Sequence, residues 1–368
     1  MKMLKNILKL TAIWMAATVS FTACEVDTTT VMFEEDHDFS QPGDTVFSML
    51  GILDKVQDVV EKGVLLGELR GDLVKPDPFV GTSSAWVDLT RFENLENATF
   101  NRYRDYYAIV NNCNFYLERA DAEMERRGQK VFLKEYAAVS AYRAWAYLQL
   151  ALLYGEVPFY TQPLLSYSEI EQVMNDPSKR KGLGEICSYF IDDLLPYVDV
   201  PFPNYGNFTY DQSSSVNSSD FFLPIRLLRG DLYLWRGSLD GNKSDFAKAA
   251  QEYRDYLLSE KRFVSPDVKV AYRTVDMDGA QIVDRWSSVF LGNNYNESIS
   301  LVPFAGNSQY GKLGSLRQSF RSFMGSDALQ KLVDESYYCY VMYTEESESG
   351  ESEYMSRFTG LAKDTLYY

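Results

Sequence analysis

The stretch from residue 135 to 158, EYAAVSAYRAWAYLQLALLYGEVP, constrains the fold more than any other part of the chain. Its six alanines favour a helix and leave room for a neighbouring helix to approach closely. Larger side chains, among them Tyr142, Trp145 and Leu148, lie between the alanines. Gly155 stands where a left-handed cap is expected, and Pro158 follows it. The pattern predicts the central helix of a helical core.

Apolar residues recur at helical spacing in further segments, which are 47–62, 98–127, 183–198, 221–236 and 244–261. The second of these is expected to form an αα-hairpin with 131–154. The last two resemble a tetratricopeptide unit, because small residues face aromatic ones, although the chain shows no strict repeat period. This reading assigns Trp145 and Trp235 to the core.

Turn-forming residues separate these segments and become frequent toward the end of the chain. Loops are expected at 71–82 and 201–219. Beyond residue 262 we expect a short strand at 297–301, a late helix at 329–335 and a hairpin of 337–345 with 353–358. The fold class predicted is mainly α, with tetratricopeptide-like helical pairs forming a scaffold, long ordered loops and a small β hairpin.

The N-terminus has the pattern of a lipoprotein signal. Lysines precede an apolar stretch at 10–19 that is too short to span a bilayer. Small residues then lead to Cys24, which suits cleavage before it and acylation of its thiol, for instance by palmitate. An ordinary secretory signal is the alternative. We expect a signal peptide at 1–23, an acylated tether at 24–45 and a single helical domain at 46–368.

Charge and residue content exclude several classes of function. The formal net charge is −16, or about −19 after loss of Lys2, Lys5 and Lys9, which argues against binding nucleic acid or anionic membranes. The single histidine, His37, lies in the tether, so catalysis by a histidine held in a pocket is excluded. Cysteines beyond Cys24 lack metal-ligand spacing. We therefore expect neither a metal nor a cofactor, and we expect the cysteines at 113 and 187 to be core residues.

Four blocks together resemble the SusD/RagB family of outer-membrane, nutrient-binding lipoproteins. They are the signal ending at Cys24, the segment 103–120 (YRDYYAIVNNCNFYLERA), the segment 142–158 (YRAWAYLQLALLYGEVP) and the helical pair 221–258. Asp193-Leu194 matches a further family position. Family members are usually longer at the C-terminus than this chain. The resemblance implies a glycan-binding lipoprotein on the outer membrane, facing the cell surface. Such a protein is not an enzyme, and it passes its ligand to a SusC-like TonB-dependent transporter.

Candidate ligand-binding residues are aromatic and polar side chains in predicted loops. In the family, the loop before the 103–120 helix contributes to ligand contact, which singles out Trp86 for sugar stacking, with Asp72 and Arg70 as hydrogen-bond partners. Packing of Trp86 on the core is the alternative. Further candidates are aromatic residues among Gly, Ser and Asn, whose amide matches a hydroxyl pair; they are Tyr205, Phe208, Tyr210, Trp286, Tyr295 and Tyr310.

Two other functions stay open at this point. A glycosidase that uses two carboxylates needs no histidine, and the chain is rich in Asp and Glu. A helical scaffold without a small ligand is the other reading. Release of reducing sugar would identify the glycosidase. Loss of glycan binding after changes to the loop tryptophans would separate the binding protein from the scaffold.

Overall fold

The computed structural model describes most of residues 43–259 and short segments beyond them. The described residues are 39, 43–71, 74–77, 84–93, 102–209, 215–259, 273–275, 282–284, 300–305, 308–309, 311–314, 323–325, 343–346 and 352–355. They form two compact units, each assembled from three separate stretches of chain. Within these residues no helix is both long and apolar enough to cross a membrane. The expectation of one domain over 46–368 stays a prediction.

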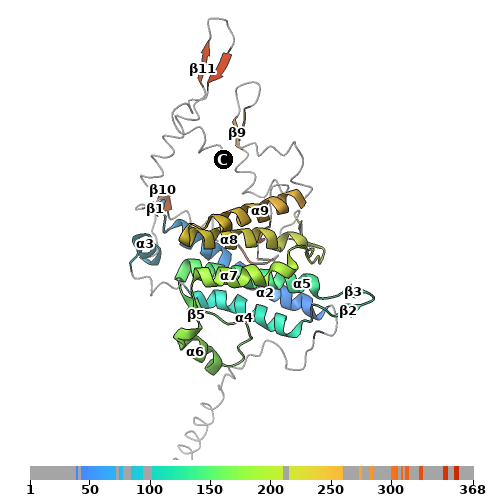
Figure 1. Ribbon diagram of the computed structural model, residues 1–368. Coiled ribbons are helices and arrows are strands. Elements are labelled where there is room, and N and C mark those ends of the chain that lie inside the picture. Colours follow the sequence, from blue (N-terminus) through green and yellow to red (C-terminus); the bar gives the residue numbers. More distant parts are fainter. Residues whose placement is uncertain are drawn as a thin grey trace, which may run out of the picture. The chain divides into compact units, whose positions relative to one another are not determined.

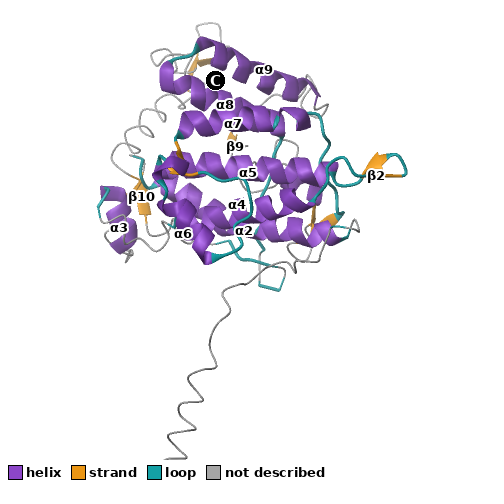
Figure 2. Ribbon diagram, turned by 60° about the horizontal axis from the view of Figure 1, so that its bottom comes forward, coloured by secondary structure: helices purple, strands orange, loops and turns teal. Residues whose placement is uncertain are grey.

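Unit 1 consists of Met1–Met49, Val110–Pro201 and Ile225–Asp255. Its described part is mainly helical, and α5, α7, α8 and α9 lie side by side in that order (Figures 1 and 2). Its elements, two of which extend beyond it, are α4 (Tyr103–Arg119), β2 (Glu125–Arg126), β3 (Gln129–Lys130), α5 (Leu133–Tyr154), β4 (Val157–Pro158), α6 (Tyr167–Asn175), β5 (Arg180–Lys181), α7 (Leu183–Asp193), α8 (Ile225–Asp240) and α9 (Lys243–Ser259).

The predicted central helix is confirmed as α5. Its alanines are buried, and Tyr142 and Tyr147 are fully enclosed among its neighbours. Gly155 ends the helix with φ of +78°, and its N–H donates to the carbonyl of Ala151 at 3.0 Å. Such a positive φ is easy only for glycine. Pro158 then lies in β4, which pairs antiparallel with β5.

A buried arginine joins three helices of unit 1. Arg143 of α5 is 7% exposed, and its Nη2 donates to Oδ2 of Asp193 at the end of α7 at 3.1 Å. Its Nη1 donates to Oδ1 of Asn114 on α4 at 3.2 Å. The Asn114 amide in turn donates to the carbonyls of Tyr160 and Gln162. A guanidinium out of water needs such partners, so Arg143, Asn114 and Asp193, which belong to the resemblance, have structural roles here.

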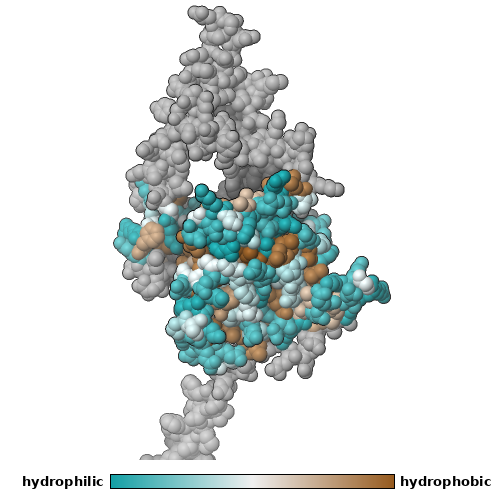
Figure 3. All heavy atoms as spheres, in the orientation of Figure 1, coloured by the Kyte–Doolittle hydropathy of each residue, from teal (hydrophilic) through white to brown (hydrophobic). Residues whose placement is uncertain are grey.

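The helices α8 and α9 form the tetratricopeptide-like pair that the sequence predicts. Gly230 lies so close to Tyr253 that a Cβ there would be 2.3 Å from the Cε1 atom of the tyrosine. The core assignment of Trp235 is wrong, because its side chain is 41% exposed, whereas Trp145 is half-buried. Figure 3 shows hydrophobic atoms over α8 among hydrophilic ones. Helical spacing alone does not tell which face of a pair meets solvent.

The helix expected at 98–127 is shorter in the structure. It begins at Tyr103 and ends at Arg119, and residues 94–101 lie outside the described part. Further on, Arg127 and Gly128 take φ of +52° and +73°, and this non-helical turn leads from β2 into its partner β3. The link to α5 is therefore a small hairpin. The helix expected at 183–198 likewise ends at Asp193, and a 3-10 turn at Leu195–Tyr197 follows.

Unit 2 consists of Leu50–Ile109, Phe202–Pro224 and Tyr256–Tyr368. Its strands form two-stranded antiparallel pairs, β1 with β10, β6 with β7, β8 with β9 and β11 with β12. Its elements include α2 (Asp44–Glu68, shared with unit 1), β1 (Val74–Pro76), α3 (Ser84–Arg91), β6 (Asn207–Thr209), β7 (Ser215–Asn217), η4 (Ser218–Phe221), β8 (Arg273–Val275), β9 (Ile282–Asp284), β10 (Phe323–Gly325), β11 (Tyr343–Glu346) and β12 (Ser352–Met355).

The structure confirms one of the predictions for unit 2 and corrects others. The pair β11–β12 confirms the late hairpin. The loops expected at 71–82 and 201–219 each contain a strand or a hairpin instead, because partners distant in sequence or across a turn complete their hydrogen bonds. Leu301 is not in a strand; its N–H donates to the carbonyl of Asp220 at 2.8 Å. The helix expected at 329–335 lies outside the described residues.

The two described free cysteines are core residues, as predicted. Cys113 and Cys187 are fully buried on α4 and α7. Burial raises the pKa of each thiol to about 12. Neither thiol is therefore a thiolate near neutral pH, which fits a packing role and not a reactive one.

We expect Gly230→Ala to lower the free energy of unfolding by about 1–3 kcal/mol, because the new methyl group overpacks the contact with Tyr253. The ring cannot simply turn aside, since its hydroxyl donates to Asp231 at 2.6 Å. Chemical denaturation measures the change. The control is Gly51→Ala on α2, where an added Cβ would meet no neighbouring atom within 4 Å. The free energy of unfolding of this variant should rise by about 0.5–1 kcal/mol. A Gly230→Ala variant as stable as the parent would contradict the close contact.

Candidate functional site

A pocket of about 260 Å³ lies within unit 2. Four segments build it: α2, the β6–β7 hairpin, η4 and the chain from residue 301 to 312. The described residues that line it are Leu50, Leu53, Asp54, Val56, Gln57, Phe208, Thr209, Val216, Phe221, Leu301, Val302, Pro303, Ala305, Gly311 and Lys312. It therefore brings together residues from the beginning, the middle and the last fifth of the chain.

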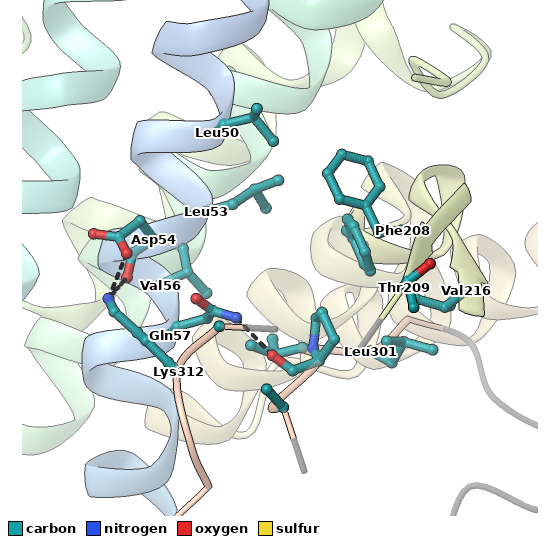
Figure 4. A pocket seen from close by; sticks show the side chains of 15 residues that line it. Leu50, Leu53, Asp54, Val56, Gln57, Phe208, Thr209, Val216, Leu301 and Lys312 are labelled. Carbon is teal, nitrogen blue, oxygen red and sulfur yellow. Dashed lines mark hydrogen bonds and ion pairs between the residues drawn. The ribbon is translucent and has the colours of Figure 1, made fainter. Parts of the chain in front are cut away.

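The walls of the pocket are apolar. Leu50 and Leu53 project from one face of α2, because residues three and four apart on a helix share a face. Phe208 faces them from β6 (Figure 4). Its ring packs edge-on against Phe221, with centroids 5.5 Å apart and planes at 63°. The hairpin thus holds an aromatic side chain at the wall of the pocket in a fixed orientation.

One edge of the pocket carries charge. The Nζ of Lys312 lies 2.6 Å from Oδ1 of Asp54 and 2.8 Å from Oδ1 of Asp58, and it donates to the Asp54 carbonyl at 2.8 Å. Partial burial raises the pKa of Asp54, but hydrogen bonds from Lys312 and Lys55 outweigh it and leave the pKa below its usual value. Burial lowers the pKa of Lys312, but its two aspartate partners raise it by more, so the pKa lies above its usual value. Both groups are charged at neutral pH.

Two uncharged polar groups also line the pocket, Gln57 on the α2 side and Thr209 on the hairpin side (Figure 4). The Nε2 of Gln57 donates to the Pro303 carbonyl at 2.6 Å, which ties α2 to the late segment (Figure 4). This is the one hydrogen bond of the Gln57 side chain within the described part of the chain, so its carbonyl oxygen remains for a ligand. Thr209 of β6 is exposed and adds a hydroxyl. The pocket can bind an apolar group and offer a few hydrogen bonds beside it.

The structure brings one of the predicted aromatic residues into the pocket. Phe208 lines it, as described above. Tyr205 comes shortly before β6 and packs its ring on Phe222, with centroids 6.3 Å apart. Its N–H donates to the hydroxyl of Ser218 at 2.7 Å. Tyr205 therefore anchors the hairpin and is not among the described lining residues.

Two further candidates lie elsewhere in unit 2. Trp86 is half-buried on α3, so its expected position in a loop is wrong; it is not among the described lining residues of the pocket. Arg70 follows the end of α2, and its Nε donates to the carbonyl of Leu66 at 2.7 Å. A basic side chain that satisfies a carbonyl of the last turn is a helix cap. Arg70 thus has a structural role here.

The remaining candidates fall outside the described residues. They are Cys24, Asp72, Tyr210, Trp286, Tyr295 and Tyr310. Their assignments stay predictions. Among the described residues there is no group of three side chains that could hold a metal ion.

Sequence reasoning missed most of the pocket. Leu50 and Leu53 show the helical spacing that also marks a core face, so the pattern could not separate a wall from a core. Lys312 lies 258 residues from Asp54, and no local signal links such distant residues. The aromatic composition of the 201–219 segment was the one signal that led to the site, through Phe208.

No model of a known protein family matches the chain, and no curated protein matches it. Solved structures do. B. fragilis NanU matches with a TM-score of 0.51 and 17% sequence identity, over 74% of this chain and 49% of that one. A SusD superfamily protein from Bacteroides vulgatus matches with a TM-score of 0.43 and 19% identity, over 59% of this chain and 42% of that one. The chain therefore shares its fold with B. fragilis NanU over the matched part.

A third solved structure, described as a laminarin binding SusD-like protein, matches with a TM-score of 0.36 and 15% identity, over 55% of this chain and 42% of that one. The chain spans about half the length of the solved structures it matches. At these identities the likeness shows the fold alone.

We expect Lys312→Met to lower the free energy of unfolding at pH 7 by about 0.5–1 kcal/mol, the range for partly exposed ion pairs. The pKa of Asp54 is lowered by folding, so its contribution is present above its ordinary value of 3.8 and is lost as the pH falls below it. The difference between variant and parent should therefore shrink at pH 3.

Chemical denaturation at pH 7 and at pH 3 measures this effect. Lys248→Met is the matched control, because Lys248 lies 4.0 Å from Asp245 and is more exposed. It should change stability little at either pH. A loss for Lys312→Met that is the same at both pH values would show that the ion pair with Asp54 is not its cause.

Proposed function

We propose that this protein is a cell-surface lipoprotein that binds an oligosaccharide or polysaccharide and delivers it to a SusC-like TonB-dependent outer-membrane transporter. The resemblance of the sequence to the SusD/RagB family supports the assignment to nutrient binding, and the fold shared with B. fragilis NanU is compatible with it. The observation that carries it is the pocket of unit 2, where Phe208, an aromatic residue expected to contact sugar, lies beside a polar edge.

The chemistry of the pocket suits a carbohydrate derivative. Sugars have C–H faces that pack on aromatic rings and hydroxyl groups that need both donors and acceptors. Phe208 supplies the ring, Gln57 an acceptor oxygen and Thr209 a hydroxyl. Binding would use these contacts without breaking any bond.

The carboxylates at the pocket support binding more than catalysis. A glycosidase needs two carboxylic groups, one of which carries a proton near neutral pH because its pKa is raised. Asp54 is the one carboxylate among the described lining residues, and its pKa is lowered. Asp54 is therefore poorly suited to donate a proton, and we propose a binding protein that is not an enzyme.

The proposed location rests on the N-terminal sequence. Acylation at Cys24 would anchor the chain in the outer membrane, and the tether at 24–45 would let the helical domain extend away from the membrane surface. The acidic balance of −16 fits a protein that does not bind nucleic acid. Transfer to the transporter is proposed on the resemblance to the SusD/RagB family.

We expect a panel of oligosaccharides to include one that binds the mature chain with saturation, as measured by isothermal titration calorimetry. Phe208→Ala should weaken that binding about tenfold, because the ring contact and its buried area are lost. The control is Phe246→Ala on α9, which removes an exposed ring that does not line the pocket.

Other outcomes would redirect the proposal. Binding that survives Phe208→Ala but is lost in Trp86→Ala would move the site to α3. Release of reducing sugar would identify a glycosidase. Absence of binding to every glycan in the panel would contradict the proposed function and favour a scaffold.

We expect Cys24→Ala to release the protein from the outer-membrane fraction, because the only acylation site that we propose is lost. Immunoblots of membrane and soluble fractions measure the distribution. Cys339→Ala is the matched control and should leave the protein in the membrane. A Cys24→Ala variant that stays membrane-bound in alkaline carbonate would contradict the anchor.

A further inference from the structure

The pocket of unit 2 has fewer free polar groups than a buried sugar ring needs. Its described polar lining residues are Asp54, Gln57, Thr209 and Lys312. Asp54 and Lys312 bind each other, and the amide nitrogen of Gln57 donates to Pro303. A hexose placed inside would bury several hydroxyl groups without partners, which is costly. The pocket therefore has partners for a sugar ring only beside Phe208, Gln57 and Thr209, and not among its apolar side chains.

The walls favour an apolar group in its place. Leu50 and Leu53 face Phe208 across the pocket (Figure 4), and Val216 and Phe221, both buried, close the side formed by the hairpin. A cavity of about 150 Å³ lined by Leu, Ile and Phe binds benzene. The present pocket, at about 260 Å³, has room for one aromatic ring and its linkage.

The charged edge does not call for an ionised ligand. Lys312 lies between Asp54 and Asp58, and Lys55 lies 3.2 Å from the second oxygen of Asp54. Two lysines thus balance two aspartates. A ligand that enters this pocket gains no net charge partner, so a neutral group is preferred over a carboxylate or an amine.

We propose that the pocket takes a neutral aryl group carried by the glycan, as an aryl glycoside or an aromatic ester would present it. The aromatic ring packs between the α2 leucines on one side and Phe208 of β6 and Phe221 of η4 on the other. The sugar stays at the polar edge, within reach of Gln57 and Thr209. The sugar half of this inference rests on the proposed function; the aryl half rests on the pocket alone.

The experiment compares matched ligands on the mature chain by isothermal titration calorimetry. Phenyl and methyl glycosides of glucose, galactose, mannose and xylose are used in pairs, with benzyl alcohol as a probe without sugar. We expect the phenyl glycoside of at least one sugar to bind tenfold or more tightly than its methyl counterpart.

Two variants locate the aryl group. Val216→Phe fills the pocket from β7, and Thr209→Trp closes it from an exposed position that should not disturb the core. Each should abolish the preference for phenyl glycosides, with thermal melting as the check on folding. Asn175→Trp places the same bulk on an exposed position of α6 that does not line the pocket, and it should leave the preference intact.

The outcomes separate this inference from the proposed function. Equal binding of phenyl and methyl glycosides would overturn the aryl site and leave glycan binding in place. Binding of benzyl alcohol and phenyl glycosides alike, with no glycan bound, would support the aryl site and reject the glycan function. A preference for phenyl glycosides that persists in folded Val216→Phe and Thr209→Trp would overturn the proposed location, and absence of phenyl glycoside binding would overturn the inference entirely.

Discussion

The ion pair of Arg143 with Asp193 is the constraint on which unit 1 depends. A guanidinium 7% exposed is stable only where carboxylate and amide oxygens replace its water, and α7 and α4 supply them. The requirement fixes the three helices in one mutual arrangement, since an apolar contact would tolerate sliding. It also reaches the segment after α5, because Asn114 holds the carbonyls of Tyr160 and Gln162.

Local signals sufficed to predict several helices of unit 1. The alanine-rich stretch and Gly155 predicted α5 and its end, and the spacing of apolar residues predicted α7 and the α8–α9 pair. These features depend on residues within one or two turns of each other. Small residues opposite aromatic ones predicted a tetratricopeptide-like pair, and the close contact of Gly230 with Tyr253 is one that the structure adds.

Features that depend on residues far apart in the sequence, on the backbone conformation of a turn or on which helix face meets solvent were not predicted. The pattern predicted a helix as far as Arg127, yet α4 ends at Arg119 and the chain then forms the β2–β3 hairpin, with positive φ at Arg127 and Gly128. Trp235 is a large aromatic residue at helical spacing, which is typical of a core, but it is 41% exposed. In the pocket, only Phe208 was singled out beforehand; the contacts of Gln57 with Pro303 and of Asp54 with Lys312 span 246 and 258 residues.

This long span has a consequence for biosynthesis. A chain made from its N-terminus presents the Leu50 and Leu53 face of α2 long before residues 301–312 exist to cover it. Contacts of such high sequence separation form late in folding, and apolar surface left open meanwhile invites association with other chains. The face that lines the finished pocket is thus the one that a nascent chain must keep away from other chains during synthesis.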